Sequence, residues 1–366
     1  MMRLAKLLST LLATLFAVAP YASDEDPVVF SFATVGDSRA EPGPELSGQD
    51  ARWLQSTRPY ARILREIQAQ HPNALFFNGD MIMGYSNDAH ELDREYAYWR
   101  GMVAGLMETG TYVVPVPGNH EVQQKVKNAA TGQTDKLANP TGENAWRANM
   151  GDLIMDKSRW TSLTGGAVDH FDPANTPAID GPDHITTDQR QLSFSFDYRD
   201  NHFVVMNTDP VGNDGHAPTN WLRDDIAAAQ KRGSKHVFVF GHKPAFTYFF
   251  RPVVSLEGFD RYPENQKAFW QVIEDSHATY FCGHEHIFNL SQPAKAAGGH
   301  AWQVMVGSGG SPFTAKPGES SKPEDRYYAW AVVQVHQSGK VHLDAWGFSD
   351  TFGSTRKLGS FELETQ

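Results

Sequence analysis

Five short clusters of metal-ligand side chains stand out in the chain, and each follows an apolar run of strand length. They read Gly36-Asp37-Ser38-Arg39, Gly79-Asp80, Gly118-Asn119-His120-Glu121, Gly241-His242 and Gly283-His284-Glu285-His286. A glycine opens every cluster, and glycine lets a chain turn sharply at the end of a strand. Aspartate, asparagine and histidine are donors that suit divalent metals. One such cluster would carry little weight, but five on one chain predict a dinuclear metal site.

The last cluster has the spacing of a ligand pair. His284 and His286 are two residues apart, so on an extended segment both side chains point to the same face. Such a pair suits two neighbouring metals, which also need a carboxylate that both can share. The only cysteine, Cys282, directly precedes this cluster. We expect it to be a buried thiol rather than a ligand, and a single cysteine allows no intramolecular disulfide.

The order and spelling of the clusters resemble the calcineurin-like metallophosphoesterases. The pattern of that superfamily runs D-x-H, G-D, G-N-H-E/D, a lone histidine and G-H-x-H, and the match spans most of the chain. Its purple-acid-phosphatase-like branch is similar in further stretches, which are 193–198, 202–208, Trp221-Leu222 and Gly307-Ser308-Gly309-Gly310. G-N-H-E followed by G-H-x-H is specific, whereas G-D alone carries almost no information.

The resemblance implies two metal ions, each divalent or trivalent, that share the carboxylate of Asp80. The remaining ligands would be Asp37 and His286 for the first metal, and Asn119, His242 and His284 for the second. Mixed oxygen and nitrogen ligation suits Mn, Fe or Zn alike, so the metal identity stays open.

The resemblance also implies a hydrolase of small phosphate esters, either monoesters or diesters. A hydroxide activated by the metals would attack phosphorus. His120, next to the Asn119 ligand, would protonate the leaving oxygen or hold the phosphoryl group. Glu121 would orient His120 or a ligand from behind.

Arg39 departs from the family pattern, because members usually carry a metal-ligating histidine there. Arginine stays protonated and cannot coordinate a metal. In purple acid phosphatases a tyrosine three residues past the bridging aspartate is a ligand, but Met83 occupies that position and Tyr85 lies two residues further on. Three interpretations follow: Arg39 binds the substrate phosphate bidentately, the first metal is exchangeable and completed by water, or the protein is a degraded relative. We favour the first two together, because the other ligand positions and His120 are intact.

The third interpretation defines the alternative function, which is a catalytically impaired metal-dependent binding protein derived from the same fold. Turnover of a phosphate ester would distinguish the two. His216 lies in a loop that could flank the cleft, although such a histidine is more often an ordinary surface residue.

The first residues have the pattern of a signal peptide. Arg3 and Lys6 precede an apolar run from Leu7 to Ala19, which is too short to span a bilayer. We expect residues 1–22 to be removed and the protein to be periplasmic or secreted, with no stable membrane anchor. The formal net charge of −11 argues against nucleic-acid binding, but not against small phosphate esters, since metals supply a local positive field.

Strand-like runs such as Val28–Val35, Ala74–Phe77 and Tyr112–Val116 alternate with helical patterns such as Tyr60–Gln70 and Glu91–Met107. This alternation predicts α/β layering, and the strand-rich C-terminal part predicts antiparallel pairing. The resemblance implies a four-layer α-β-β-α sandwich of two mixed sheets with flanking helices. The metal site would lie at the C-terminal ends of strands.

One metallophosphoesterase domain is expected over residues 27–350. Residues 123–188 have little periodicity and much Gly, Asn, Asp and Pro, so they predict a loop-rich insertion. Because this insertion follows His120 directly, it forms either a rim over the site or a loose surface loop.

Overall fold

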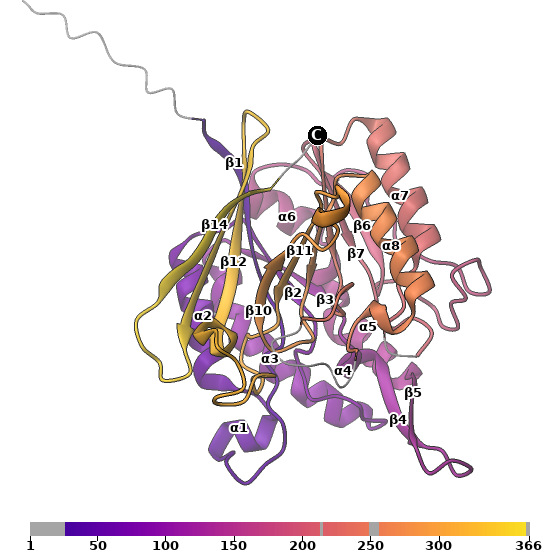
Figure 1. Ribbon diagram of the computed structural model, residues 1–366, viewed down its shortest axis with the longest axis vertical. Coiled ribbons are helices and arrows are strands. Elements are labelled where there is room, and N and C mark those ends of the chain that lie inside the picture. The colour runs from indigo at the N-terminus through magenta and orange to yellow at the C-terminus, as the bar shows by residue number, and fades with distance from the viewer. Residues whose placement is uncertain (1–25, 213–214, 249–255, 364–366) are drawn as a thin grey trace, which may run out of the picture.

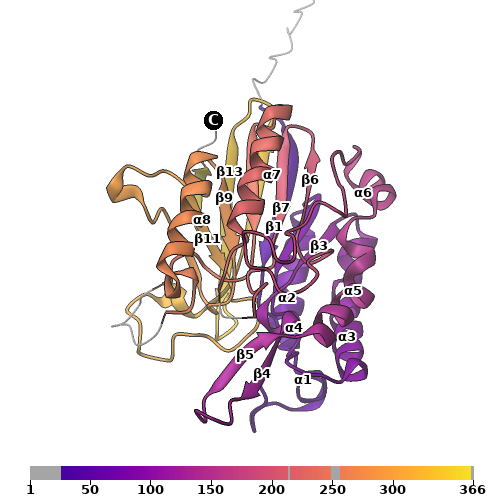
Figure 2. The ribbon, with the colours of Figure 1, turned by 90° about the vertical axis from the view of Figure 1, so that its right-hand side faces the viewer.

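Two six-stranded mixed sheets pack face to face, with helices on their outer sides, in the computed structural model (Figures 1 and 2). The structure describes residues 26–212, 215–248 and 256–363. The predicted signal peptide, residues 1–22, therefore lies outside the described residues. The arrangement confirms the predicted α/β sandwich of two mixed sheets with flanking helices.

The first sheet joins the two ends of the described chain. Its order is β14-β13-β12-β1-β2-β3, with bounds Arg356–Leu363, Val341–Ser349, Tyr327–His336, Val28–Val35, Ala74–Asn78 and Tyr112–Val116. β1, β2 and β3 are parallel, whereas β12, β13 and β14 pair antiparallel. Since β14 pairs with β13, the sheet continues past residue 350, where the domain was predicted to end.

The second sheet has parallel strands at its centre. Its order is β10-β11-β9-β8-β7-β6, with bounds Phe288–Ser291, Trp302–Val306, Thr279–Cys282, His236–Phe240, Asn201–Val205 and Phe194–Tyr198. β11, β9, β8 and β7 are parallel, and the edge strands β10 and β6 pair antiparallel. A separate hairpin, β4 (Gln123–Lys127) and β5 (Thr134–Ala138), projects at the lower right of Figure 1.

Helices cover the outer side of each sheet. The α-helices are α1 (Gly48–Trp53), α2 (Thr57–Ala69), α3 (Ala89–Glu108), α4 (Asn119–Val122), α5 (Pro140–Ile154), α6 (Lys157–Thr164), α7 (Thr219–Arg232) and α8 (Pro263–Asp275). Short 3₁₀ turns are η1 (Phe259–Arg261), η2 (Lys295–Ala297) and η3 (Pro323–Arg326). α2, α3, α5 and α6 pack on the first sheet, and α7 and α8 on the second. Among the described residues, no helix is long and apolar enough to cross a membrane.

The apolar pattern explains these elements. In α2 the buried side chains Tyr60, Ile63, Leu64 and Ile67 recur at helical spacing and form one stripe toward the core. β2 and β3 are buried along their whole length, as expected for parallel strands covered on both faces. The carboxyl ends of β1, β2, β3, β8 and β9 therefore emerge at one side of the sandwich, each followed by a ligand-type cluster.

The segment from 123 to 188 contains more regular structure than the sequence predicts. It holds the β4–β5 hairpin, α5 and α6, and only its last part is irregular. The sequence does not indicate α5 clearly, because this helix contains two glycines and has a weak amphipathic pattern. It nevertheless buries Trp146, Met150 and Leu153 against the first sheet. The expectation of a loose surface loop is wrong for this first part, which packs against α3, α4 and β3.

The two sheets are joined by an aromatic core. The ring of Phe32 in β1 lies 5.4 Å from that of Phe76 in β2, and 5.2, 5.6 and 5.6 Å from Phe238, Phe240 and Phe281 in the second sheet. All five side chains are fully buried. These rings meet edge to face, and their packing fixes the spacing of the sheets and so the relative positions of the strand ends.

Phe32→Ala should lower the free energy of unfolding by about 3–5 kcal/mol, because it removes a ring from the centre of this core and leaves a cavity. Val28→Ala in the same strand is the matched control, since Val28 is 44% exposed. Urea unfolding followed by circular dichroism measures both. A loss below about 1 kcal/mol for Phe32→Ala would contradict the role assigned to the inter-sheet core.

Candidate metal centre

The second of the predicted ligand groups comes together around His242. Its Nε2 lies 3.2 Å from Asp80 Oδ1, 3.0 Å from Asn119 Oδ1 and 3.2 Å from His284 Nδ1. Asp80, His242 and His284 meet the spacing that one metal ion requires. The Asn119 amide oxygen adds a neutral donor to the same point.

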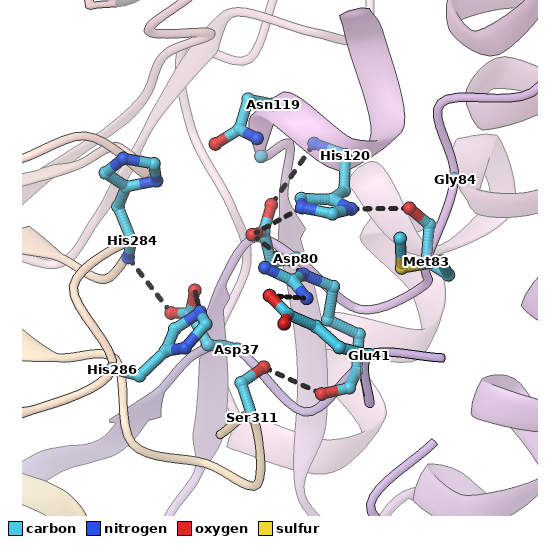
Figure 3. Close-up of polar contacts among 12 residues, drawn as sticks. Asp37, Glu41, Asp80, Met83, Gly84, Asn119, His120, His284, His286 and Ser311 are labelled. Atoms are coloured by element: carbon cyan, nitrogen blue, oxygen red, sulfur yellow. Dashed lines mark hydrogen bonds and ion pairs between the residues drawn. The ribbon is translucent and has the colours of Figure 1, made fainter. Parts of the chain in front are cut away.

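The first predicted group lies on the other side of the same carboxylate. Asp37, Asp80 and His286 present ligand atoms within 4.8 Å of one another, and His286 Nε2 is 3.6 Å from Asp37 Oδ1. Figure 3 shows Asp80 between Asn119 on one side and Asp37 with His286 on the other. Asp80 therefore belongs to both groups, as expected for a bridging ligand.

Backbone carbonyls orient the histidines. His242 Nδ1 lies 2.8 Å from the Asn78 carbonyl, and His286 Nδ1 lies 2.6 Å from the Pro312 carbonyl. Since a carbonyl only accepts, Nδ1 carries the hydrogen and Nε2 faces the carboxylates. His284 is turned the other way, because its Nε2 faces Lys243 Nζ at 3.0 Å.

The charges of these residues fit metal ions. Asp37 Oδ1 is buried and has no hydrogen-bond partner among the described residues, and burial raises the pKa of Asp37 well above its usual range. Burial opposes charge on His242 as well, but Asp80 and Asp37 outweigh it and raise the pKa of His242 to about 9. Burial lowers the pKa of His286 to about 3. The buried carboxylates favour a cation between them, and His286 is a neutral imidazole. A metal ion needs both, because it is positively charged and its histidine ligands must be deprotonated.

The backbone at the ligands is strained. Asp37, Asp80 and His284 have φ values of 63°, 54° and 69°, in the left-handed region that side-chain-bearing residues rarely adopt. The preceding glycines make room for it: a Cβ on Gly283 would lie 2.3 Å from Asp37 Oδ2. Glycine at this place is thus required by close approach.

Glu121 fixes the backbone around Asp80. Its carboxylate accepts hydrogen bonds from the backbone N–H groups of Gly118, Asp80, Met81 and Ile82 at 2.7 to 3.2 Å. Of the two roles predicted for Glu121, the geometry favours orientation of a ligand, and the ligand is Asp80.

His120 stands beside the shared carboxylate. Its Nδ1 contacts the Met83 carbonyl, and its Nε2 is 3.7 Å from Asp80 Oδ2. The Tyr85 ring packs 4.2 Å from the imidazole. Burial disfavours the charged imidazole and lowers the pKa of His120 well below its ordinary value.

Arg39 lies against Asp80 and is almost fully buried. Its Nε is 3.4 Å from Asp80 Oδ2 and its Nη1 is 3.4 Å from Glu41 Oε1. Although burial opposes ionisation of Asp80, the attraction of His120, His242 and Arg39 outweighs it and holds the pKa of Asp80 well below its usual range. Tyr85 does not replace the missing ligand of the first group, because its hydroxyl contacts the Asn119 amide.

His216 is placed apart from these groups. Its backbone N–H donates to the Thr208 carbonyl, and its ring packs against Tyr262. It belongs neither to a metal group nor to the lining of the site pocket within the described residues.

Three lysines near the site were not identified from the sequence. Buried Lys243 contacts His284, and Lys125 and Lys136 line a pocket of about 460 Å³ together with Arg39, Asn119, His120 and His284. The position of Lys243 directly after His242 was a usable signal. Lys125 and Lys136 could not be found without the strand register of the hairpin.

The comparisons with known proteins agree with this geometry. Residues 53–288, more than half of the chain, match the calcineurin-like phosphoesterase family. The fold is similar to purple acid phosphatase PPD1 from yellow lupin (Lupinus luteus) seeds, with a TM-score of 0.58, 12% identity, and coverage of 92% of this chain and 54% of that one. The chain thus spans about half the length of the lupin protein.

PhoD is similar as well, with a TM-score of 0.54, 12% identity, and coverage of 91% of this chain and 72% of that one. At these identities the two neighbours support the fold alone. No curated protein matches the chain in sequence. The family match spans more than half of the chain and includes β2, β3, β8 and β9 with the clusters that follow them, so the chain belongs to the calcineurin-like phosphoesterase family.

Proposed function

We propose that the protein hydrolyses small phosphate esters at a centre of two metal ions, with Mn, Fe or Zn as candidates. The observation that carries the proposal is the pair of ligand groups that share Asp80 beside a pocket lined by His120 and Arg39. When bound, two metals lower the pKa of a water molecule and screen the charge of the phosphoryl oxygens. The net charge of −11 favours a small ester over a nucleic acid.

The side chains around the pocket divide the remaining tasks. Arg39 offers a planar cation to the phosphoryl oxygens, while its contacts with Asp80 and Glu41 keep the guanidinium in place. His120, fixed through Nδ1 by the Met83 carbonyl, directs Nε2 toward the place where the ester binds. Donating to the leaving oxygen or holding the phosphoryl group requires a proton on Nε2 as well, and the negative charge of a bound phosphate ester favours that protonated imidazole.

We also propose that the protein acts in the periplasm or outside the cell. The support is the pattern of Arg3, Lys6 and the apolar run that follows them. Mass spectrometry of the protein from its native host should show a chain that lacks residues 1–22. Recovery of the full-length chain from the cytoplasm would reject this proposal.

The direct test is turnover of 4-nitrophenyl phosphate by the purified protein with Mn²⁺ or Zn²⁺. Activity should disappear with a chelator and return when metal is restored. Metal binding without turnover of any phosphate ester would instead favour the impaired binding protein, an alternative that the Arg39–Asp80 contact supports.

His120→Ala should lower kcat roughly 10²–10⁴-fold, the usual effect of a lost proton donor. Bound metal should stay at the wild-type level, because His120 is outside both ligand groups. If His120 protonates the leaving group, 4-nitrophenyl phosphate should lose less activity than phenyl phosphate. An equal loss for both esters would assign His120 to holding the phosphoryl group, and loss of metal would make it a ligand.

Arg39→Ala should weaken inhibition by inorganic phosphate roughly ten- to a hundred-fold, since a bidentate charged pair contributes about 1.5–3 kcal/mol. Arg39→His should restore a ligand, strengthen the weaker metal and reduce phosphate affinity. Inhibition kinetics and metal titration measure the two effects. Unchanged phosphate inhibition in Arg39→Ala would leave Arg39 only as the charge partner of Asp80.

A further inference from the structure

The pocket beside the metal groups is bordered by the β4–β5 hairpin. Its lining includes Lys125 from β4 and Lys136 from β5, in addition to His120 and His284 of the site. The hairpin leaves the body of the molecule directly after α4, the turn that carries Asn119 and His120 (Figure 2). The pocket therefore extends from the candidate metal groups to the β4–β5 hairpin.

The strand register places the two lysines on the same face. Lys125 and Lys136 are direct partners in the antiparallel pair. Like charges in directly opposite positions destabilise a hairpin, so this pairing of two lysines is costly for folding. The base of the hairpin is nevertheless well anchored: buried Gln123 donates to Asp209 Oδ1 at 3.1 Å and to the Gly212 carbonyl at 2.8 Å.

The pocket concentrates positive charge on a chain with a net charge of −11. Among the described residues that line it, three side chains are cationic, Arg39, Lys125 and Lys136, and one is acidic, Glu41. Lys125 Nζ lies 3.9 Å from the centre of the Tyr85 ring, which positions it over the site. Burial lowers the pKa of Lys125, and Lys136 and Arg39 lower it further.

Lys127 provides an internal comparison. It lies on the same strand and is exposed, as Lys125 is, but it does not line the pocket. If the lysines of the hairpin served only solubility, their position relative to the pocket would not matter. Lys125 and Lys136 line the pocket, whereas Lys127 does not.

We propose that Lys125 and Lys136 bind a second anionic group of the substrate, so that the preferred substrates are phosphate esters whose organic part carries a further phosphate or carboxylate. The inference rests on the proposed function. In either case the substrate carries two anionic groups. Arg39 and the metals would bind the phosphoryl group, and the two lysines would bind the second anion.

The test compares two phosphonates that cannot be hydrolysed, phenylphosphonate and its 4-carboxy derivative, by calorimetry on the Mn²⁺-loaded protein. The wild type should bind the carboxylate-bearing ligand roughly ten-fold or more tightly than the plain one, as expected for charge-assisted contacts. Lys125→Gln and Lys136→Gln should each reduce that ratio, and the double variant should bring it close to one. Lys127→Gln is the control of equal charge and should keep the wild-type ratio.

Three results would overturn the inference: no preference in the wild type, an unchanged ratio in the double variant, or an equal decrease in Lys127→Gln. The matched pair of phenyl phosphates, with and without the 4-carboxylate, tests turnover separately. If the wild type hydrolyses neither ester, the proposed function fails, but the phosphonate ratio still decides whether the lysines form an anion site. Thermal unfolding of each variant verifies that its fold is intact.

Discussion

The carboxylate of Asp80 is the group on which the rest of this structure depends. It is buried, and a buried carboxylate is stable only when cations or hydrogen bonds compensate it. His242, His120 and Arg39 approach it from three sides at 3.2 to 3.7 Å. Glu121 fixes the backbone that carries it, and both candidate metal groups contain it. The two sheets serve to bring these elements to one point.

Arg39 makes the two halves of the centre unequal. Among the described residues, the group with His242 and His284 has Asp80 and Asn119 as further donors, whereas the group with His286 has Asp37 and Asp80. A permanent cation beside the shared carboxylate lowers the attraction for a metal on the poorer side. The same cation is available to a phosphate oxyanion, so in the proposed function weaker metal binding and stronger substrate binding would have one cause.

Much of this could be predicted from the sequence, because the signals are local. β1 and β3 have the predicted bounds, and β2 is one residue longer than its apolar run. Each ligand cluster follows its strand within a few residues, so the convergence of parallel strand ends was sufficient to bring the ligands together. The family resemblance supplied the pairing of ligands with metals, and two candidate metal groups in the structure contain Asp80 with His242 and His284, and Asp80 with Asp37 and His286.

The remaining features depend on contacts between distant residues. β4 and β5 consist mostly of polar side chains and, apart from buried Gln123, are largely exposed, so no apolar alternation marks them. The opposition of Lys125 and Lys136 follows from their register, which no local pattern reveals. The sequence does not decide whether Glu121 orients His120 or a metal ligand. Only the fold brings its carboxylate to the N–H groups that follow Gly79. α5 was missed because tertiary packing, rather than a strong amphipathic pattern, stabilises it.

We propose that the carboxylate of Asp80 is shared by two metal groups of unequal affinity. Metal bound per chain, measured by mass spectrometry after equilibrium dialysis, tests it in Asp80→Ala, with Asp37→Ala as the one-sided comparison. We expect two metals of different affinity in the wild type, one tightly bound metal in Asp37→Ala, and none tightly bound in Asp80→Ala. If folded Asp80→Ala protein retained a tightly bound metal pair, Asp80 would not be the shared ligand.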